Sequence, residues 1–170
     1  VAGLPCYAKW STNKTSATTT QGVLHMFTHI LVPVDGSPTA AVTVKKAAAL
    51  AKVFNSQVTA VYVIDPYPFT GVGADFAYGQ AQYLTAATTE AHTALDAVKT
   101  LMEQAGVAVE IVVGEGHSVH NGIMEAAKAT GADLIVMGSH GRKGLEKLVL
   151  GSVTQRVLAD SLIPVLVVRQ

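Results

Sequence analysis

The sequence contains little of several residue types, and each shortage excludes a class of protein. Cys6 is the only cysteine among 170 residues, which excludes an intrachain disulfide and a cysteine-ligated zinc site. The 12 basic residues balance the 12 acidic ones, so the strong basic excess of nucleic-acid-binding proteins is missing. No apolar run approaches the roughly 20 residues that cross a bilayer. We therefore expect a soluble, cytoplasmic domain without a nucleic-acid or membrane partner.

The first 25 residues differ in composition from the rest of the chain. The stretch STNKTSATTT is polar and has no periodicity, and no basic start with an apolar core marks a secretory signal. Met26 stands directly before the first apolar run. We interpret residues 1–25 as an amino-terminal extension left by an expression tag, with a native arm that packs on a partner as the alternative. Residues 26–170 are then one domain.

From Phe27 onward, β-rich runs alternate with patterns of helical period. One helix is expected to have Ser37 as its cap and Pro38 at its first position. A second, long helix carries an apolar stripe from Leu84 to Met102, and Gly106 ends it. The segment 65–79 before that helix is a long connection that either covers a ligand or is a mobile surface loop. Strands are expected at residues 27–34, 57–64, 107–113, 133–138 and 163–168.

Two more helices complete the alternation. Ser118 is expected to cap a helix that runs through Lys128. Ser152 and Gln155 have the capping-box spacing at the start of the last helix. Apolar strands linked by helices predict a parallel sheet covered on both faces. Ligands of such sheets bind beyond the carboxyl ends of the strands, where the strand order reverses.

The loop after the fourth strand has the spacing Gly-x2-Gly-x9-Gly-Ser, made by Gly138, Gly141, Gly151 and Ser152. It is neither a Walker A loop nor Gly-x-Gly-x-x-Gly. Glycines allow positive φ and close backbone approach, and a helix opening at Ser152 adds free N–H groups and the positive end of its dipole. This pattern predicts a phosphate site; the alternative is a plain turn before a cap. Further groups that suit a phosphate are the hydroxyls of Ser139 and Ser152 and the cations Arg142 and Lys143.

Three stretches in this order resemble the universal stress protein family of the UspA type: ILVPVDGSPTA, VMGSHGRKGLEKLVLGSVTQRVL and PVLVV. The resemblance covers about residues 26–170. It implies an open, Rossmann-like α/β fold related to the adenine nucleotide alpha hydrolases, with five parallel strands in the order 3-2-1-4-5 and helices on both faces. It also implies ATP binding, because family members that keep the glycine loop resemble ATP binders.

The resemblance assigns roles to individual residues. Asp35 is expected at the ribose or adenine end, although an Asx turn in Asp-Gly-Ser-Pro is the alternative reading. The backbone of Val63 is expected to contact adenine. The full set of expected ATP-binding residues is Pro33, Val34, Asp35, Val63, Met137, Gly138, Ser139, His140, Gly141, Arg142, Gly151, Ser152, Val153 and Thr154.

The sequence favours an ATP-binding stress sensor or regulator over a fast enzyme. Phosphate donors are present but no convincing base is, so His140 is a weak candidate and at most slow ATP hydrolysis is expected. Mg²⁺ or Mn²⁺ could accompany the phosphates, while His117 and His120 lack the partners of a metal site of their own. The alternatives are a slow ATP-hydrolysing enzyme of a related adenine-nucleotide fold and a dimeric scaffold without nucleotide. The resemblance also implies a homodimer joined through the edge strand 163–168.

Overall fold

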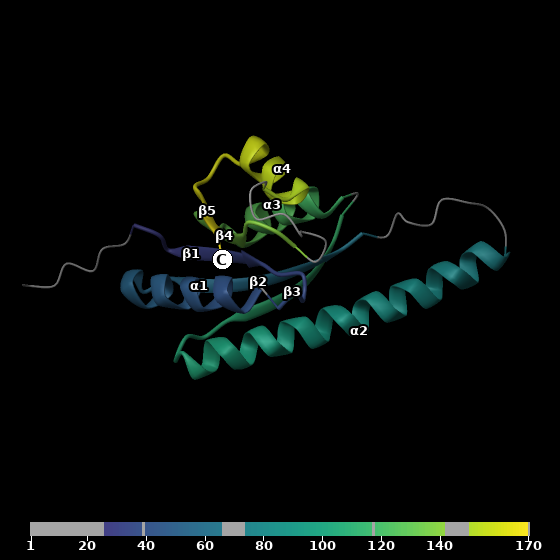
Figure 1. Cartoon of the computed structure of the whole chain (residues 1–170), viewed down its shortest axis with the longest axis horizontal. Coiled ribbons are helices and arrows are strands. Elements are labelled where there is room, and N and C mark those ends of the chain that lie inside the picture. The colour runs from purple at the N-terminus through teal and green to yellow at the C-terminus, as the bar shows by residue number, and fades with distance from the viewer. Residues whose placement is uncertain (1–25, 39, 66–73, 117, 142–149, 170) are drawn as a thin grey trace, which may run out of the picture.

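The computed structural model describes residues 26–38, 40–65, 74–116, 118–141 and 150–169. Its centre is a parallel sheet of five strands in the order β3-β2-β1-β4-β5, which confirms the expected sheet and strand order (Figure 1). The strands are β1 (His29–Pro33), β2 (Gln57–Ile64), β3 (Glu110–Glu115), β4 (Leu134–Gly138) and β5 (Val165–Val168).

Helices cover both faces of the sheet, as expected. The helices are α1 (Ala40–Phe54), α2 (Ala74–Gln104), α3 (Val119–Thr130) and α4 (Ser152–Asp160). Helices α1 and α2 lie on one face, whereas α3 and α4 lie on the other (Figure 1). Within the described ranges, no helix combines the length and apolar character needed to cross a membrane.

Successive residues of the central strand β1 contribute to opposite layers of the core. Ile30 and Val32 pack in the cluster that contains residues of α1 and α2, whereas Leu31 packs in the cluster of α3 and α4. All three side chains are fully buried, and each contributes about 1.5–3 kcal/mol of hydrophobic stabilisation. The apolar character on both faces follows from this two-sided burial.

Four of the five strands begin later than the sequence indicates, and β4 does so by one residue, at Leu134. β1 begins at His29, and the N–H groups of both Thr28 and His29 donate to the carboxylate of Asp133. β3 begins at Glu110, since the N–H of Val107 donates to the carbonyl of Met102 and closes the end of α2. β5 begins at Val165, directly after Pro164, which has no N–H to donate to a neighbouring strand.

Two helix starts also differ from the expected ones. α1 begins at Ala40 rather than at Pro38, and the Ala40 N–H donates to the carbonyl of Ser37 (3.0 Å). The prediction of a capping box at Ser152 is wrong, because Gly151 is the N-cap of α4. The side-chain amide of Gln155 donates instead to the carbonyl of Leu150 (2.6 Å).

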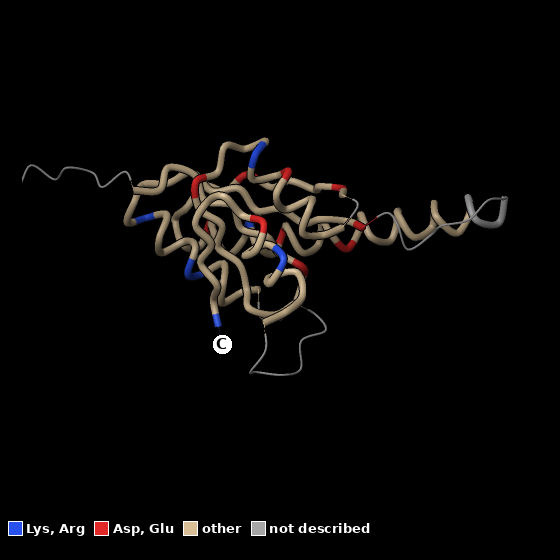
Figure 2. The backbone as a smooth tube through the Cα atoms, turned by 90° about the horizontal axis from the view of Figure 1, so that it is seen from above, with Lys and Arg blue, Asp and Glu red and all other residues tan. Residues whose placement is uncertain are grey.

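Helix α2 is longer than the apolar stripe alone indicates. It begins at Ala74, so residues 74–79 are helical rather than part of a connection, whereas 66–73 lie outside the described residues. Its amino-terminal part extends beyond the sheet in both views (Figures 1 and 2). Residues 76–89 carry no charged side chain, and Figure 2 shows most of that stretch in tan, the colour of uncharged residues.

Candidate functional site

A cavity of about 530 Å³ opens at the carboxyl ends of β1, β2 and β4. This volume lies in the range of about 300–1,000 Å³ that is typical of small-molecule sites. The strand order reverses here, because β1 leads to β2 on one side and β4 lies on the other. Twelve of the fourteen residues expected from the sequence line it: Pro33, Val34, Asp35, Val63, Met137, Gly138, His140, Gly141, Gly151, Ser152, Val153 and Thr154.

The amino ends of three helices converge on this cavity. Ala40, Val119 and Ser152 are the first residues of α1, α3 and α4, and all three line it. In α4, the first hydrogen bond within the helix is donated by the Gln155 N–H to the carbonyl of Gly151 (2.9 Å). The N–H groups of residues 152–154 precede that bond and are directed toward the amino end of the helix. The described part of the site therefore presents a positive partial charge that comes from backbone N–H groups.

The loop glycines bring backbone segments and side chains into close approach. A Cβ atom on Gly141 would lie 2.7 Å from Oδ2 of Asp35, and one on Gly151 would lie 3.3 Å from the carbonyl oxygen of Ser139. Positive φ is not the reason for these glycines, contrary to expectation. Among the described glycines only Gly36, Gly106 and Gly131 have positive φ. Gly138, Gly141 and Gly151 are required for space rather than for an unusual backbone conformation.

Asp35 forms the Asx turn that was the alternative reading of the sequence, and it also lines the cavity. Its Oδ1 accepts the N–H of Ser37 (3.0 Å), and Gly36 between them has a φ of 74°, so the Asx turn is present. Its Oδ2 faces the glycine loop at Gly141. The turn therefore holds the carboxylate at the cavity and leaves one oxygen directed toward the loop.

Ser139 lies outside the described cavity lining, and its groups are used within the fold. Its N–H donates to the carbonyl of Val168 (2.9 Å), and its hydroxyl lies 3.0 Å from Nδ1 of His140. The Thr154 hydroxyl is likewise structural, because it donates to the carbonyl of Gly138 (3.0 Å). Together with the Gly151 N–H, which donates to the Ser139 carbonyl (2.8 Å), these bonds fasten the start of α4 to the end of β4.

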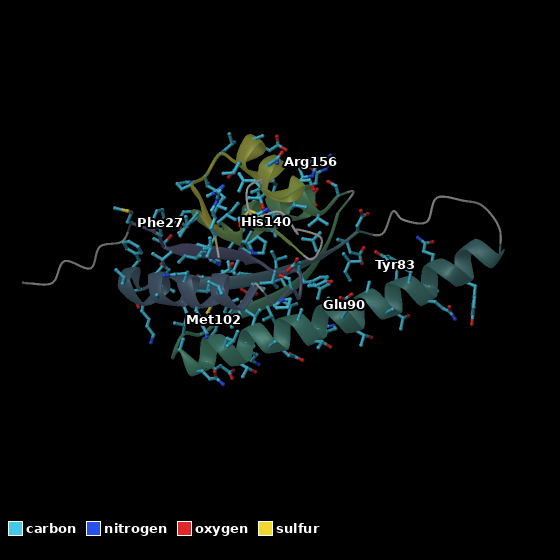
Figure 3. The ribbon with its side chains drawn as sticks, in the orientation of Figure 1. Phe27, Tyr83, Glu90, Met102, His140 and Arg156 are labelled. Atoms are coloured by element: carbon cyan, nitrogen blue, oxygen red, sulfur yellow. The ribbon has the colours of Figure 1, made fainter. Side chains whose placement is uncertain are left out.

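His140 follows Ser139 in the sequence. In the view of Figure 3 it lies between α1 and the helices α3 and α4. Arg142 and Lys143, which the sequence suggested as neighbours of a phosphate, lie outside the described residues. Among the described lining residues, Asp35 carries the one formal charge when His140 is neutral. The backbone, not basic side chains, thus supplies the anion-attracting character of the described part of the site.

The other side of the cavity is apolar. It is formed by Tyr62 and Val63 of β2, Val119 and Ile123 of α3, and Met137 of β4. Sequence reasoning found Val63 and Met137 only. The residues that it missed are Ser37, Ala40, Thr43, Tyr62, Val119 and Ile123. The four-residue spacing of Val119 and Ile123 does indicate a shared helix face, but it does not tell which ligand or strand that face meets.

The described residues contain no group of three or more His, Cys, Asp or Glu side chains that could hold a metal ion. His120 contacts two oxygen atoms instead. Its Nδ1 lies 2.8 Å from the hydroxyl of Ser118, and its Nε2 lies 3.6 Å from Oδ2 of Asp160. His117 lies outside the described part of the chain.

Comparison with known proteins gives consistent matches. A sequence model of the universal stress protein family matches residues 26–169. The chain is 38% identical over 146 residues to universal stress protein MJ0531 of Methanocaldococcus jannaschii, covering 86% of this chain and 84% of the relative.

Solved structures match over a similar extent. The structure of MJ0577 from the same organism has a TM-score of 0.74 and 32% identity, covering 85% of this chain and 97% of that one. A universal stress protein of Archaeoglobus fulgidus in complex with dAMP has a TM-score of 0.63 at 22% identity, covering 84% of this chain and 98% of that one. That second likeness concerns the fold alone.

Proposed function

The chain belongs to the universal stress protein family, and from this premise we propose that it binds ATP in the cavity at the carboxyl ends of β1, β2 and β4. The observation that carries the proposal is the meeting of helix amino ends with a loop that lacks side chains at Gly141 and Gly151. The N–H groups of residues 152–154 would hold phosphate oxygens. Gly138, Gly141 and Gly151 would let the phosphate chain approach the backbone.

The adenine base would occupy the apolar side of the cavity. Val63, Val119, Ile123 and Met137 offer a surface that suits a flat ring, and the Val63 backbone would hydrogen-bond to its edge. Asp35 would accept hydrogen bonds from ribose hydroxyls with the oxygen that does not hold the Ser37 N–H.

A divalent cation would be held mainly by the nucleotide. Asp35 is the one carboxylate among the described lining residues, and Mg²⁺ commonly binds through one or two carboxylates together with phosphates and water. Mg²⁺ or Mn²⁺ would then offset phosphate charge that the described side chains leave uncompensated. This arrangement predicts that ATP without the cation binds more weakly.

We propose that the protein works as a cytoplasmic sensor or regulator whose signal is the bound nucleotide. Fast phosphoryl transfer needs a positioned base and charge-stabilising donors. His140 lines the cavity, but the hydroxyl of Ser139 lies 3.0 Å from its Nδ1. We propose slow hydrolysis at most. Slow hydrolysis by a related enzyme, or a scaffold without nucleotide, are the competing functions.

Calorimetry with ATP, ADP, AMP and adenosine tests the proposal directly, and mass spectrometry of denatured protein would identify any co-purified nucleotide. We expect ATP to bind in the presence of Mg²⁺ and to be recovered largely intact. Absence of binding to all four compounds would favour the scaffold. Rapid turnover of ATP would favour the enzyme.

We also propose a homodimer formed through residues 163–168. β5 lies at an edge of the sheet, and the apolar side chains Leu162 and Leu166 are 99% and 40% exposed. An exposed apolar edge strand favours pairing with a second copy. Light scattering should give twice the mass of the chain, and Leu166→Glu should give a monomer. A monomeric unaltered protein would contradict this assembly.

A further inference from the structure

A second group of glycines lies beside the apolar side of the cavity, and phosphate binding does not explain it. Gly122 is buried in α3, where a Cβ atom would lie 2.5 Å from Cγ1 and 3.2 Å from Cγ2 of Val63. Its φ is not positive, so any residue could adopt this helical backbone. Alanine is the better helix former, and only the lack of space beside Val63 favours glycine here.

The turn that leads into α3 reinforces this close contact. A Cβ atom on Gly116 would lie 2.8 Å from the backbone nitrogen of Gly122 and 3.0 Å from its Cα. The Gly122 N–H donates to the carbonyl of Ser118 (3.1 Å), which belongs to the same first turn. Two positions without side chains thus let the turn, α3 and β2 pack directly against one another.

Three apolar residues that line the cavity lie at this contact between α3 and β2. Val63 is the residue that Gly122 touches, while Val119 and Ile123 flank Gly122 in the first turns of α3. A methyl group on residue 122 would force α3 and β2 apart by on the order of 1 Å, because ordinary carbon contacts lie near 4 Å. That shift would change the position of Val119 and Ile123 relative to Val63.

We propose that Gly122 is a positioning residue that sets the width of the apolar compartment and so adapts it to a flat base. The inference rests on the proposed function, since it takes the apolar side of the cavity as the site of the adenine ring. It assigns selectivity to the packing of α3 on β2, independently of the loop that receives the phosphates.

The test compares Gly122→Ala with the unaltered protein for three probes: adenosine, ATP with Mg²⁺, and inorganic tripolyphosphate with Mg²⁺. We expect the affinities for adenosine and ATP to fall by the same factor of about tenfold, the scale on which one misplaced methylene acts in an apolar pocket. The affinity for tripolyphosphate should not change. Urea unfolding of each variant reports separately on stability.

Gly114→Ala is the matched control, because it adds a methyl group beside the same valine at ordinary distances. That Cβ atom would lie 3.6 Å from Cγ2 of Val61 and 3.8 Å from Cγ2 of Val63. The binding of all three probes should remain as in the unaltered protein. A tenfold loss in this variant as well would show that any added bulk near Val63 has the effect, and would overturn the special role of Gly122.

A double-mutant cycle isolates the contact itself. Val63→Ala removes the two γ-carbons that a methyl group on residue 122 would strike. In that background, adding Gly122→Ala should not weaken adenosine binding further. The comparison of Val63→Ala with the double variant also tests the inference if the single variant Gly122→Ala does not fold. A full tenfold loss in the Val63→Ala background would overturn the inference.

The outcomes separate the two proposals. If the unaltered protein binds neither ATP nor adenosine, the proposed function is refuted and the inference with it. If it binds both and Gly122→Ala binds them equally well, or loses tripolyphosphate to the same extent, the inference alone is refuted.

Discussion

The two ends of the sheet each carry a hollow, and helix amino ends converge on the smaller one. A groove of about 870 Å³ lies at the amino ends of β1, β2 and β3, compared with about 530 Å³ at the carboxyl ends. Asn55 and Gly106, which follow the last turns of α1 and α2, line this groove. Helix carboxyl ends carry a negative partial charge, whereas the smaller cavity receives three amino ends. Helix direction, rather than volume, therefore distinguishes the two hollows.

Side-chain hydrogen bonds also fasten the amino end of the sheet. The carboxylate of Asp133 accepts bonds from the Thr28 N–H (2.8 Å), the Thr28 hydroxyl (2.6 Å) and the His29 N–H (3.0 Å). Phe27, which Figure 3 labels near this end, packs edge to face on Phe54 with ring centroids 5.4 Å apart. We conclude that one end stabilises the fold and that the other provides the binding groups. Substitutions at the two ends should therefore have opposite consequences.

The largest effect should come from Gly151→Val at the carboxyl end. The added side chain would crowd the Ser139 carbonyl and His140 and keep phosphates from the start of α4. ATP affinity should fall by about 100-fold, because a hydrogen bond to a charged group contributes about 1.5–3 kcal/mol. The backbone of residue 151 (φ −61°, ψ 150°) suits valine, so any loss of stability in urea should come from the contact with the Ser139 carbonyl alone. Unchanged calorimetric affinity would remove the distinction between the two ends.

Asp133→Ala should have the reverse pattern. It leaves the N–H groups of Thr28 and His29 without their acceptor, and the free energy of unfolding should fall by about 2 kcal/mol after allowance for partial exposure. ATP affinity should stay the same, since the residue lies at the opposite end of the sheet. Urea unfolding and calorimetry on one preparation check both statements. Loss of ATP binding by the folded variant would contradict the separation.

The same carboxylate predicts how stability depends on pH. Partial burial by itself would raise the pKa of Asp133, but the hydrogen bonds from Thr28 and His29 outweigh it and hold the pKa below its ordinary value of 3.8. Because the folded pKa is depressed, this contribution is present above the unfolded pKa and is lost as the pH falls through the folded pKa. The stability difference between the unaltered protein and Asp133→Asn should therefore shrink below about pH 4. A difference that grows under acid would reverse the sign and refute the account.

Asp35→Ala tests the proposed ribose contact at the carboxyl end. If Oδ2 accepts a ribose hydroxyl, the variant should bind ATP about tenfold more weakly, which is the scale of one hydrogen bond of about 1.4 kcal/mol. Its affinity for the nucleotide that lacks that hydroxyl should fall less. Calorimetry with ATP and dATP gives the two factors. Equal factors would mean that the carboxylate serves only the turn with Ser37.

The smallest effect should come from Ser56→Ala at the amino end. Its hydroxyl donates to the carbonyl of Phe27 (2.6 Å), and the loss should lower stability by about 1 kcal/mol. ATP affinity should not change. A fall in the free energy of unfolding as large as that of Asp133→Ala would show that the Ser56 bond contributes as much stability as the bonds of Asp133.

Much of the fold follows from local pattern. The run of residues 57–64 coincides with β2, and the glycine loop lies between β4 and α4 as expected. Such features depend on side-chain period and on hydrogen bonds between near neighbours, which a single sequence displays. The predicted start of β3 was wrong because the N–H of Val107 donates to the carbonyl of Met102 at the end of α2 rather than to a neighbouring strand.

The alternation of strands and helices and the position of a loop with glycines at residues 138, 141 and 151 could be read from the sequence, since both depend on short-range periodicity and on the spacing of glycines. Only the tertiary structure decided that the amino ends of α1, α3 and α4 meet in one cavity. Only it paired Asp133 with Thr28 across 105 residues and set Gly122 against Val63. These contacts join segments that periodicity does not relate, because their closeness results from packing two helical layers on a shared sheet.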